Sequence, residues 1–183
     1  LDELVRAGSL LSRDMNLKSM ISALVDQSLD ITKSDLACLY LRVDPEDRRS
    51  DLRLMYRRGR FPAPELLPAG SQTVEFAAES GEAILLLERK PSPFRDLLLV
   101  QQMHSGIALP LATPALHLGV LILNSLQPQH YGRSALRFLD SYAKLAGGML
   151  HNSRLFQELK ETLRHIEALE RYQQSIFSSM TNL

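Results

Sequence analysis

The side chains that could bind a metal ion or act as nucleophiles are few and widely separated in this sequence. Its histidines are His104, His117, His130, His151 and His165. No two of them stand four residues apart on a predicted helix, the spacing that lets two side chains bind one metal ion. The pattern therefore predicts no metal site. One histidine could still ligate a haem, but structural or exposed roles are the more ordinary use of single histidines.

The one cysteine, Cys38, excludes an internal disulfide and any site built from several cysteines. It alternates with Leu36 and Tyr40 in an apolar run, which is typical of a small buried hydrophobic residue. The alternative is a redox-active thiol, which would need a basic and partly exposed setting. We favour the buried residue.

A group of arginines in "RLMYRRGR" offers the clearest concentration of charge. Its members are Arg53, Arg57, Arg58 and Arg60, and the carboxylates Asp44, Glu46, Asp47 and Asp51 precede them on the same predicted hairpin. The group could bind an anionic ligand or partner, but a solvated turn balanced by these carboxylates is the interpretation we favour. No glycine-rich phosphate loop, nucleophile elbow or metal motif is present, so we predict no catalytic residue.

Composition narrows the class of protein. Lysine plus arginine and aspartate plus glutamate both number 21, so the formal net charge is zero and nothing in it indicates nucleic acid or an anionic membrane. No apolar stretch approaches the roughly 20 residues that span a bilayer, and no signal peptide is visible. We expect a cytoplasmic location without direct membrane contact. The chain begins without a methionine and both ends have helical patterns, so we expect a piece of a longer polypeptide.

The apolar pattern predicts an α+β fold. Helices are expected near residues 1–11, over 17–32, near 73–80, as a turn or two within 94–105, and from Arg133 onward; strands are expected over 36–43, 52–58, 83–88, 105–113 and 116–125. Residues 59–70 contain three prolines and two glycines and are expected to be irregular. Short links join the strands, so the sheet should be antiparallel, with the doubly apolar strand 36–43 near its centre.

Four segments, in this order, resemble a GAF domain, a sensory module of bacterial signalling proteins and phosphodiesterases. They are "ALVDQSLDITKSDLACLYL", "AAESGEAILL", "SGIALPLATPALHLGVLILNS" and "LRFLDSYAKLAGGMLHNSRLFQELK". The resemblance covers about residues 1–160, and we assign residues 1–154 to the domain. It implies an antiparallel sheet of five or six strands with a helical bundle on one face. On the other face it implies a ligand pocket closed by residues 59–103.

The motifs that bind cyclic nucleotides in this family are incomplete here. Asn124 matches the family's Asn-Lys pair, but Ser125 stands in place of the lysine. Tyr131 replaces a phenylalanine, and Ala135 and Leu136 replace an Asp-Glu pair. The resemblance therefore argues against cyclic nucleotide as the ligand.

Covalent bilin attachment is also disfavoured, because the family's cysteine is absent before Ser105, where Met103 and His104 stand. A methionine sulfoxide reductase of this family would need partner cysteines for Cys38, and the chain has none. The family's pocket region makes Phe61, Phe76, Phe94, Met103 and His104 the ligand-contact candidates. The same residues could instead form the core or a lid, and the cofactor remains open.

The end of the chain carries a seven-residue repeat. Its positions are Leu155, Leu159, Thr162, Ile166, Leu169, Gln173, Ile176, Met180 and Leu183, spaced alternately by four and three. Such spacing is typical of a coiled coil, in which a polar residue such as Gln173 can set the register. We predict that residues 155–183 form a parallel homodimeric coil, joined by an N-terminal helix bearing Leu4, Val5 and Leu11. The alternative is a helix that folds back on its own domain.

These features predict a regulatory module and no enzyme in this fragment. It would bind a small molecule or partner and pass the signal through the dimeric coil to a downstream output domain. The closing "QSIFSSMTNL" resembles the lead-in to a PAS domain, which favours a two-component sensor histidine kinase as the parent. One alternative is a ligand-free GAF spacer that dimerises a kinase, nucleotide cyclase or transcription regulator. The other is a stand-alone reductase, which the cysteine count disfavours.

Overall fold

A computed structural model describes residues 16–182 of the chain. The predicted N-terminal helix with Leu4, Val5 and Leu11 lies outside the described residues, as does Leu183 at the end of the seven-residue repeat. The chain divides into two compact units, Leu1–His151 and Asn152–Leu183. No helix among residues 16–182 is long and apolar enough to cross a membrane.

The first unit is built on a six-stranded antiparallel sheet with strand order β3-β2-β1-β6-β5-β4. Its strands are β1 Leu36–Arg42, β2 Leu52–Gly59, β3 Leu66–Leu67, β4 Ile84–Leu86, β5 Ser105–Ala112 and β6 His117–Ser125. Strand β1 lies between β2 and β6, so the predicted position near the centre is confirmed. The α+β class and the antiparallel sheet are confirmed as well.

Strand β3 corrects one expectation. Residues 59–70 were expected to be irregular throughout, yet β3 pairs with β2 through Leu52 opposite Leu67 and Arg53 opposite Leu66. A two-residue strand is too short to show an alternating pattern, and its pairing depends on a partner well back along the chain.

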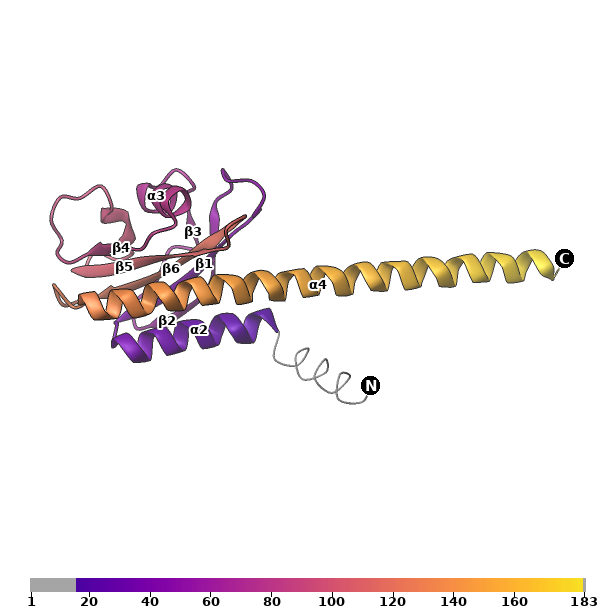
Figure 1. The fold of residues 1–183 in the computed structure, drawn as a ribbon, viewed down its shortest axis with the longest axis horizontal. Helices are drawn as coiled ribbons and strands as arrows, with labels where there is room; N and C mark the ends of the chain where they lie inside the picture. Colours follow the sequence, from indigo (N-terminus) through magenta and orange to yellow (C-terminus); the bar gives the residue numbers. More distant parts are fainter. Residues whose placement is uncertain (1–15, 183) are drawn as a thin grey trace. The chain divides into compact units, whose positions relative to one another are not determined.

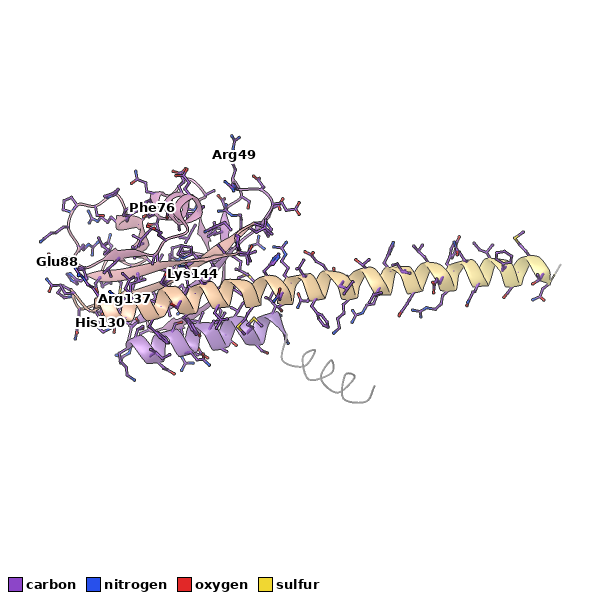
Figure 2. The ribbon with its side chains drawn as sticks, viewed as in Figure 1. Arg49, Phe76, Glu88, His130, Arg137 and Lys144 are labelled. Atoms are coloured by element: carbon purple, nitrogen blue, oxygen red, sulfur yellow. The ribbon has the colours of Figure 1, made fainter. Side chains whose placement is uncertain are left out.

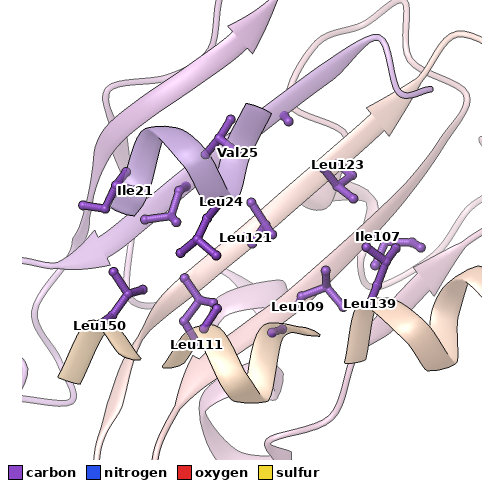
Figure 3. Packing of buried hydrophobic residues seen from close by; sticks show 14 of the residues in the cluster. Ile21, Leu24, Val25, Ile107, Leu109, Leu111, Leu121, Leu123, Leu139 and Leu150 are labelled. Atoms are coloured by element: carbon purple, nitrogen blue, oxygen red, sulfur yellow. The ribbon is translucent and has the colours of Figure 1, made fainter. Parts of the chain in front are cut away.

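Two helices cover one face of the sheet (Figure 1). Helix α2, Leu17–Thr32, begins at Asn16, whose side chain accepts a hydrogen bond from the Lys18 amide at 3.1 Å. It ends at Lys33, which adopts a left-handed conformation with φ 53°. Its buried side chains pack with the first part of helix α4, Arg133–Thr181, and with the sheet. Figure 3 shows this helix-side cluster, which includes Ile21, Leu24, Val25, Ile107, Leu109, Leu111, Leu121, Leu123, Leu139 and Leu150.

The opposite face is covered by helix α3, Gln72–Ser80, the 3₁₀ turn η1, Arg95–Leu97, and their connecting loops (Figure 1). Helix α3 begins at Ser71, whose hydroxyl accepts from the Val74 amide, and ends at Gly81 with φ 65°. A second group of buried side chains fills this face, here called the loop-side cluster. It comprises Leu36, Cys38, Tyr40, Leu52, Leu67, Val74, Ile84, Leu86, Leu97, Met103, Ala108, Val120 and Ile122. Each is at most 8% exposed, so this face is a second hydrophobic core.

Candidate functional site

The five residues predicted to contact a ligand occupy different environments around the loop-side cluster. Phe61 and Phe94 pack against it, and Met103 belongs to it and is fully buried. Phe76, which Figure 2 shows on α3, has its ring 5.0 Å from that of Phe94. His104 is exposed. The structure therefore brings the Phe76 and Phe94 rings together at the surface of this cluster. Ligand contact by any of the five stays a prediction.

Asn124 has a role in the loop-side cluster that its sequence context did not indicate. It is fully buried on β6, and its Nδ2 donates to the Leu97 carbonyl at 2.9 Å. Its Oδ1 accepts from the Leu99 amide at 2.8 Å. One side chain thus fixes the backbone of η1 against the sheet. An asparagine inside the apolar run "GVLILNS" was the only signal, because a polar residue in a buried strand needs partners.

Arg42 is the second polar residue that sequence reasoning missed. It is the last residue of β1, in phase with Cys38 and Tyr40 of the loop-side cluster, and only 4% exposed. Its Nη1 donates to the carbonyl oxygens of Arg48 and Ser50 at 2.7 and 2.8 Å, which holds the loop between β1 and β2. An arginine that closes the apolar run "LACLYLR" was the available signal.

The other end of the Arg42 guanidinium meets His117 at the start of β6. Arg42 Nη2 lies 3.3 Å from His117 Nδ1, which accepts the hydrogen bond when the imidazole is neutral. Burial, together with the positive charges of Arg42 and Arg48, lowers the pKa of His117 from 6.5 to about 4. His117 is therefore neutral at pH 7, as this contact requires.

A cavity of 430 Å³ lies beside Arg42. It is lined by Arg42, Arg48, Arg49, Ala69, Gly70, Val74, Glu75, Ala78 and Glu79, and is here called the Arg42 cavity. Two arginines come from the loop between β1 and β2, and both glutamates come from α3. A smaller cavity of 250 Å³, lined in part by His117, shares Arg48, Ala78 and Glu79 with it. The volume of the Arg42 cavity is in the range of small-molecule sites.

Cys38 is buried in the loop-side cluster, as the alternation had indicated. Burial raises the pKa of its thiol to about 12, because the thiolate would lose its hydration. The thiol is therefore protonated at neutral pH and suited to packing rather than redox chemistry. Among residues 16–182, no three histidine, cysteine, aspartate or glutamate side chains gather in a way that could hold a metal ion.

The arginine group on β2 is solvated, as we had favoured. Arg57 and Arg58 are exposed, and Arg57 Nη1 donates to the Phe61 carbonyl at 2.9 Å. The carboxylate that pairs with Arg58 is Asp26 on α2, at 3.3 Å, instead of one on the hairpin itself. These contacts anchor the end of β2 and leave no arginine of this group in the Arg42 cavity.

The second unit, Asn152–Leu183, is helical as far as Thr181 and carries exposed apolar side chains. Every residue from Gln157 to Asn182 is exposed. The exposed apolar side chains include Leu155, Leu159, Leu163, Ile166, Leu169, Ile176, Phe177 and Met180. Apolar side chains repeated on one face of a solvated helix are typical of a surface that another helix covers.

Comparison with known proteins shows the fold. No protein-family model and no curated protein matches the sequence. Among solved structures, the GAF domain of Acinetobacter phosphoenolpyruvate-protein phosphotransferase is 20% identical with a TM-score of 0.64, over 82% of this chain and 94% of that one. The GAF-B domain of DevS from Mycobacterium smegmatis is 14% identical with a TM-score of 0.63, over 79% and 99%.

A solved enzyme is similar to a comparable degree. Free methionine-R-sulfoxide reductase from Neisseria meningitidis, in complex with its substrate, is 20% identical with a TM-score of 0.63, over 75% of this chain and 81% of that one. The neighbours share one architecture and differ in what they do, and a shared fold does not carry a function with it.

Proposed function

We propose that this chain, which has the GAF fold, is the sensory module of a signal-transduction protein and acts as a parallel homodimer joined through α4. The similar solved structures include GAF domains of bacterial signalling proteins, which supports a regulatory role in place of catalysis. The fully buried thiol of Cys38 also favours regulation over a reductase, whose nucleophile would have to meet its substrate.

The exposed apolar repeat of the second unit is the observation that carries this proposal. Leu159 is 56% exposed and Ile166 is 47% exposed, although each is a large aliphatic side chain. Burying such a side chain contributes roughly 1.5–3 kcal/mol. A second copy of the same helix would cover the whole repeat at once, because the two apolar stripes are identical and in register.

The same seven-residue phase is found earlier on α4. Counting back in sevens from Leu159 gives Asn152, then Leu145 and Phe138, and the last two are 65% and 50% exposed. Exposed apolar residues in the phase of the repeat are thus found on α4 within the first unit as well. Phe138 also stacks on Tyr142, with ring centroids 6.0 Å apart.

We infer that the parent protein is a sensor histidine kinase. The inference rests on an exit helix with a heptad repeat and on the resemblance of "QSIFSSMTNL" to a PAS lead-in. In such an arrangement a ligand shifts the output only through its different affinities for two helix registers. The alternative is a GAF-fold spacer without a ligand, and the filled loop-side cluster supports it.

Oligomeric state tests the dimer. We expect sedimentation velocity on the purified chain to give a dimer at tens of micromolar, and Leu159→Lys/Ile166→Lys to give a monomer. Gln157→Lys/Ala168→Lys adds the same charge on positions outside the repeat and should remain dimeric. A monomeric wild type, or a dimer that survives the first pair, would refute the proposal.

Two deletions in α4, one that keeps the helical phase and one that changes it, test the signalling role in the parent protein. Deleting residues 160–166 removes one heptad and keeps the phase, so ligand- or signal-dependent autophosphorylation should persist. Deleting residues 160–163 rotates everything downstream and should change the output. Equal output from both deletions would contradict transmission through the coil and support a passive spacer.

A further inference from the structure

Arg42 is buried without a carboxylate partner among residues 16–182. No carboxylate oxygen of the described residues lies within 4.0 Å of it, whereas Arg58 and Arg154 each have one. A charged side chain that is 4% exposed is almost always paired in proteins, because its lost hydration must be replaced. The positive charge of Arg42 is thus offset only from a greater distance, by Asp47, and no carboxylate binds it directly.

The guanidinium also has unused donors. Nη1 directs its two hydrogens to the Arg48 and Ser50 carbonyls, and Nη2 contacts His117 through one. Nε is buried and has no hydrogen-bond partner among the described residues. Since a guanidinium has five N–H donors, Nε–H and one hydrogen of Nη2 remain without a partner among the described residues. Carboxylate and phosphate oxygens are the acceptors that bind guanidinium donors most strongly.

The Arg42 cavity adds further positive charge next to this group. Arg48 and Arg49 line it from the loop that Arg42 anchors, and Figure 2 shows Arg49 reaching outward from that loop. Neither side chain makes an ion pair in the described structure. Both are therefore available to turn toward an anion in the cavity.

Negative charges limit what the cavity can accept. Glu75 and Glu79 line it from α3, and Asp47 interacts electrostatically with Arg42. The N-terminal amides of α3 at Thr73 and Val74 are already bound by Asp96 and Ser71. The arginines thus have to supply the attraction, and three arginines against two lining glutamates suit a small anion better than a polyphosphate.

We propose that the Arg42 cavity binds a small molecule through a carboxylate or phosphate group, held by Arg42 with Arg48 and Arg49. Such binding would link the loop between β1 and β2 to α3, because the three arginines and α3 line the same space. As the input of a sensory module the site rests on the function proposed above. Binding itself is measurable whether or not the chain dimerises.

Titration with two probes tests the site and separates its possible ligands. Inorganic phosphate and malonate are added in turn to ¹⁵N-labelled protein at pH 7, with sodium chloride holding the ionic strength constant. We expect saturable shifts in the amide signals of residues 48–50 and 69–70. Saturation by phosphate alone, or by malonate alone, would identify the head group. Saturation by neither would overturn the proposal.

Matched variants locate the binding. Arg49→Gln removes one exposed charge, and Ala78→Leu fills the cavity with another good helix former, so each should weaken binding at least tenfold. Arg53→Gln makes the same charge change on β2, outside the cavity, and should bind as the wild type does. Equal weakening by Arg49→Gln and Arg53→Gln would show non-specific attraction and overturn the site.

Arg42→Lys tests the role of the buried Arg42 guanidinium directly. The variant keeps the charge but loses the planar guanidinium and its unused donors, so binding should fall even when its melting temperature and amide spectrum show a folded domain. If Arg42→Lys does not fold, Ala78→Leu and Arg49→Gln still decide the question. Failure of these titrations with an intact dimer would reject the site alone, and a monomer that binds the anion would reject only the dimer.

Discussion

The side-chain Nδ2 of Asn124 on β6 donates a 2.9 Å hydrogen bond to the backbone carbonyl of Leu97 in η1, across 27 residues of sequence. The same amide accepts from the Leu99 backbone through Oδ1. A residue that resembles part of a nucleotide-binding motif therefore serves as the attachment point of a loop. Both hydrogen bonds are formed inside the domain. The side-chain amide of Asn124 therefore cannot bind a ligand in these two directions.

Replacing this asparagine should destabilise the domain strongly. Asn124→Ala leaves the Leu99 amide and the Leu97 carbonyl without their partner, and we expect the free energy of unfolding to fall by about 2–4 kcal/mol. Urea denaturation measures the change. Gln157→Ala, at an exposed helical position outside the repeat, should stay within about 0.5 kcal/mol of the wild type. A loss below that value at Asn124 would contradict the assigned role.

Two adjacent glycines on α4 should respond in opposite directions to the same substitution. A Cβ at Gly147 would lie 2.6 Å from the Ala112 carbonyl oxygen on β5, whereas one at Gly148 would meet nothing within 4 Å. Gly147→Ala must push the helix from the sheet and should cost about 2 kcal/mol or more. Gly148→Ala should stabilise the helix by about 0.5–1 kcal/mol. Thermal unfolding of both variants checks the pair, and changes of the same sign would contradict this packing.

His117 should make stability depend on pH below neutrality. Its pKa is about 4 in the folded chain and 6.5 in the unfolded chain, so the unfolded state binds the proton first as pH falls. The contribution of His117 to the free energy of unfolding is fully present above pH 6.5. It decreases as the pH falls from 6.5 to about 4, by at most about 3 kcal/mol.

The His117 contribution is isolated by comparing the wild type with His117→Gln at pH 7 and pH 4.5. Carboxylates titrate in both proteins, so their effect cancels in the difference. The wild type should lose more stability than the variant over this interval, as measured by urea denaturation. An equal loss would show that the imidazole is not held neutral by burial and by its arginine neighbours.

Gln173 and Gln174 provide a matched test of the heptad register. Gln173 occupies the repeat and its neighbour does not, although both are exposed in the described chain. If the dimeric coil forms as proposed, Gln173→Leu removes a polar core residue and should raise the melting temperature of the dimer. Gln174→Leu should leave it nearly unchanged. A greater rise for Gln174→Leu would place the interface on a different face.

The local sequence pattern was sufficient to predict most of the fold. The helix 17–32, the glycine that ends α3 at Gly81 and the paired strands β5 and β6 were all predicted from spacing and turn residues. The heptad repeat of α4 can likewise be read directly from the chain. These features depend on neighbours within a few residues, so a linear sequence contains them.

Only the tertiary packing decided which polar residues come together at the candidate site. Arg42 and His117 are 75 residues apart in sequence, yet β1 lies beside β6 and brings them into contact. There Arg42 is buried and His117 half-buried, and this burial lowers the pKa of the imidazole, while no carboxylate contacts the arginine directly. Burial and missing partners are properties of the surroundings, so residue type and spacing could not indicate them. The short strand β3 escaped prediction for the same reason, since only its partner β2 makes it a strand.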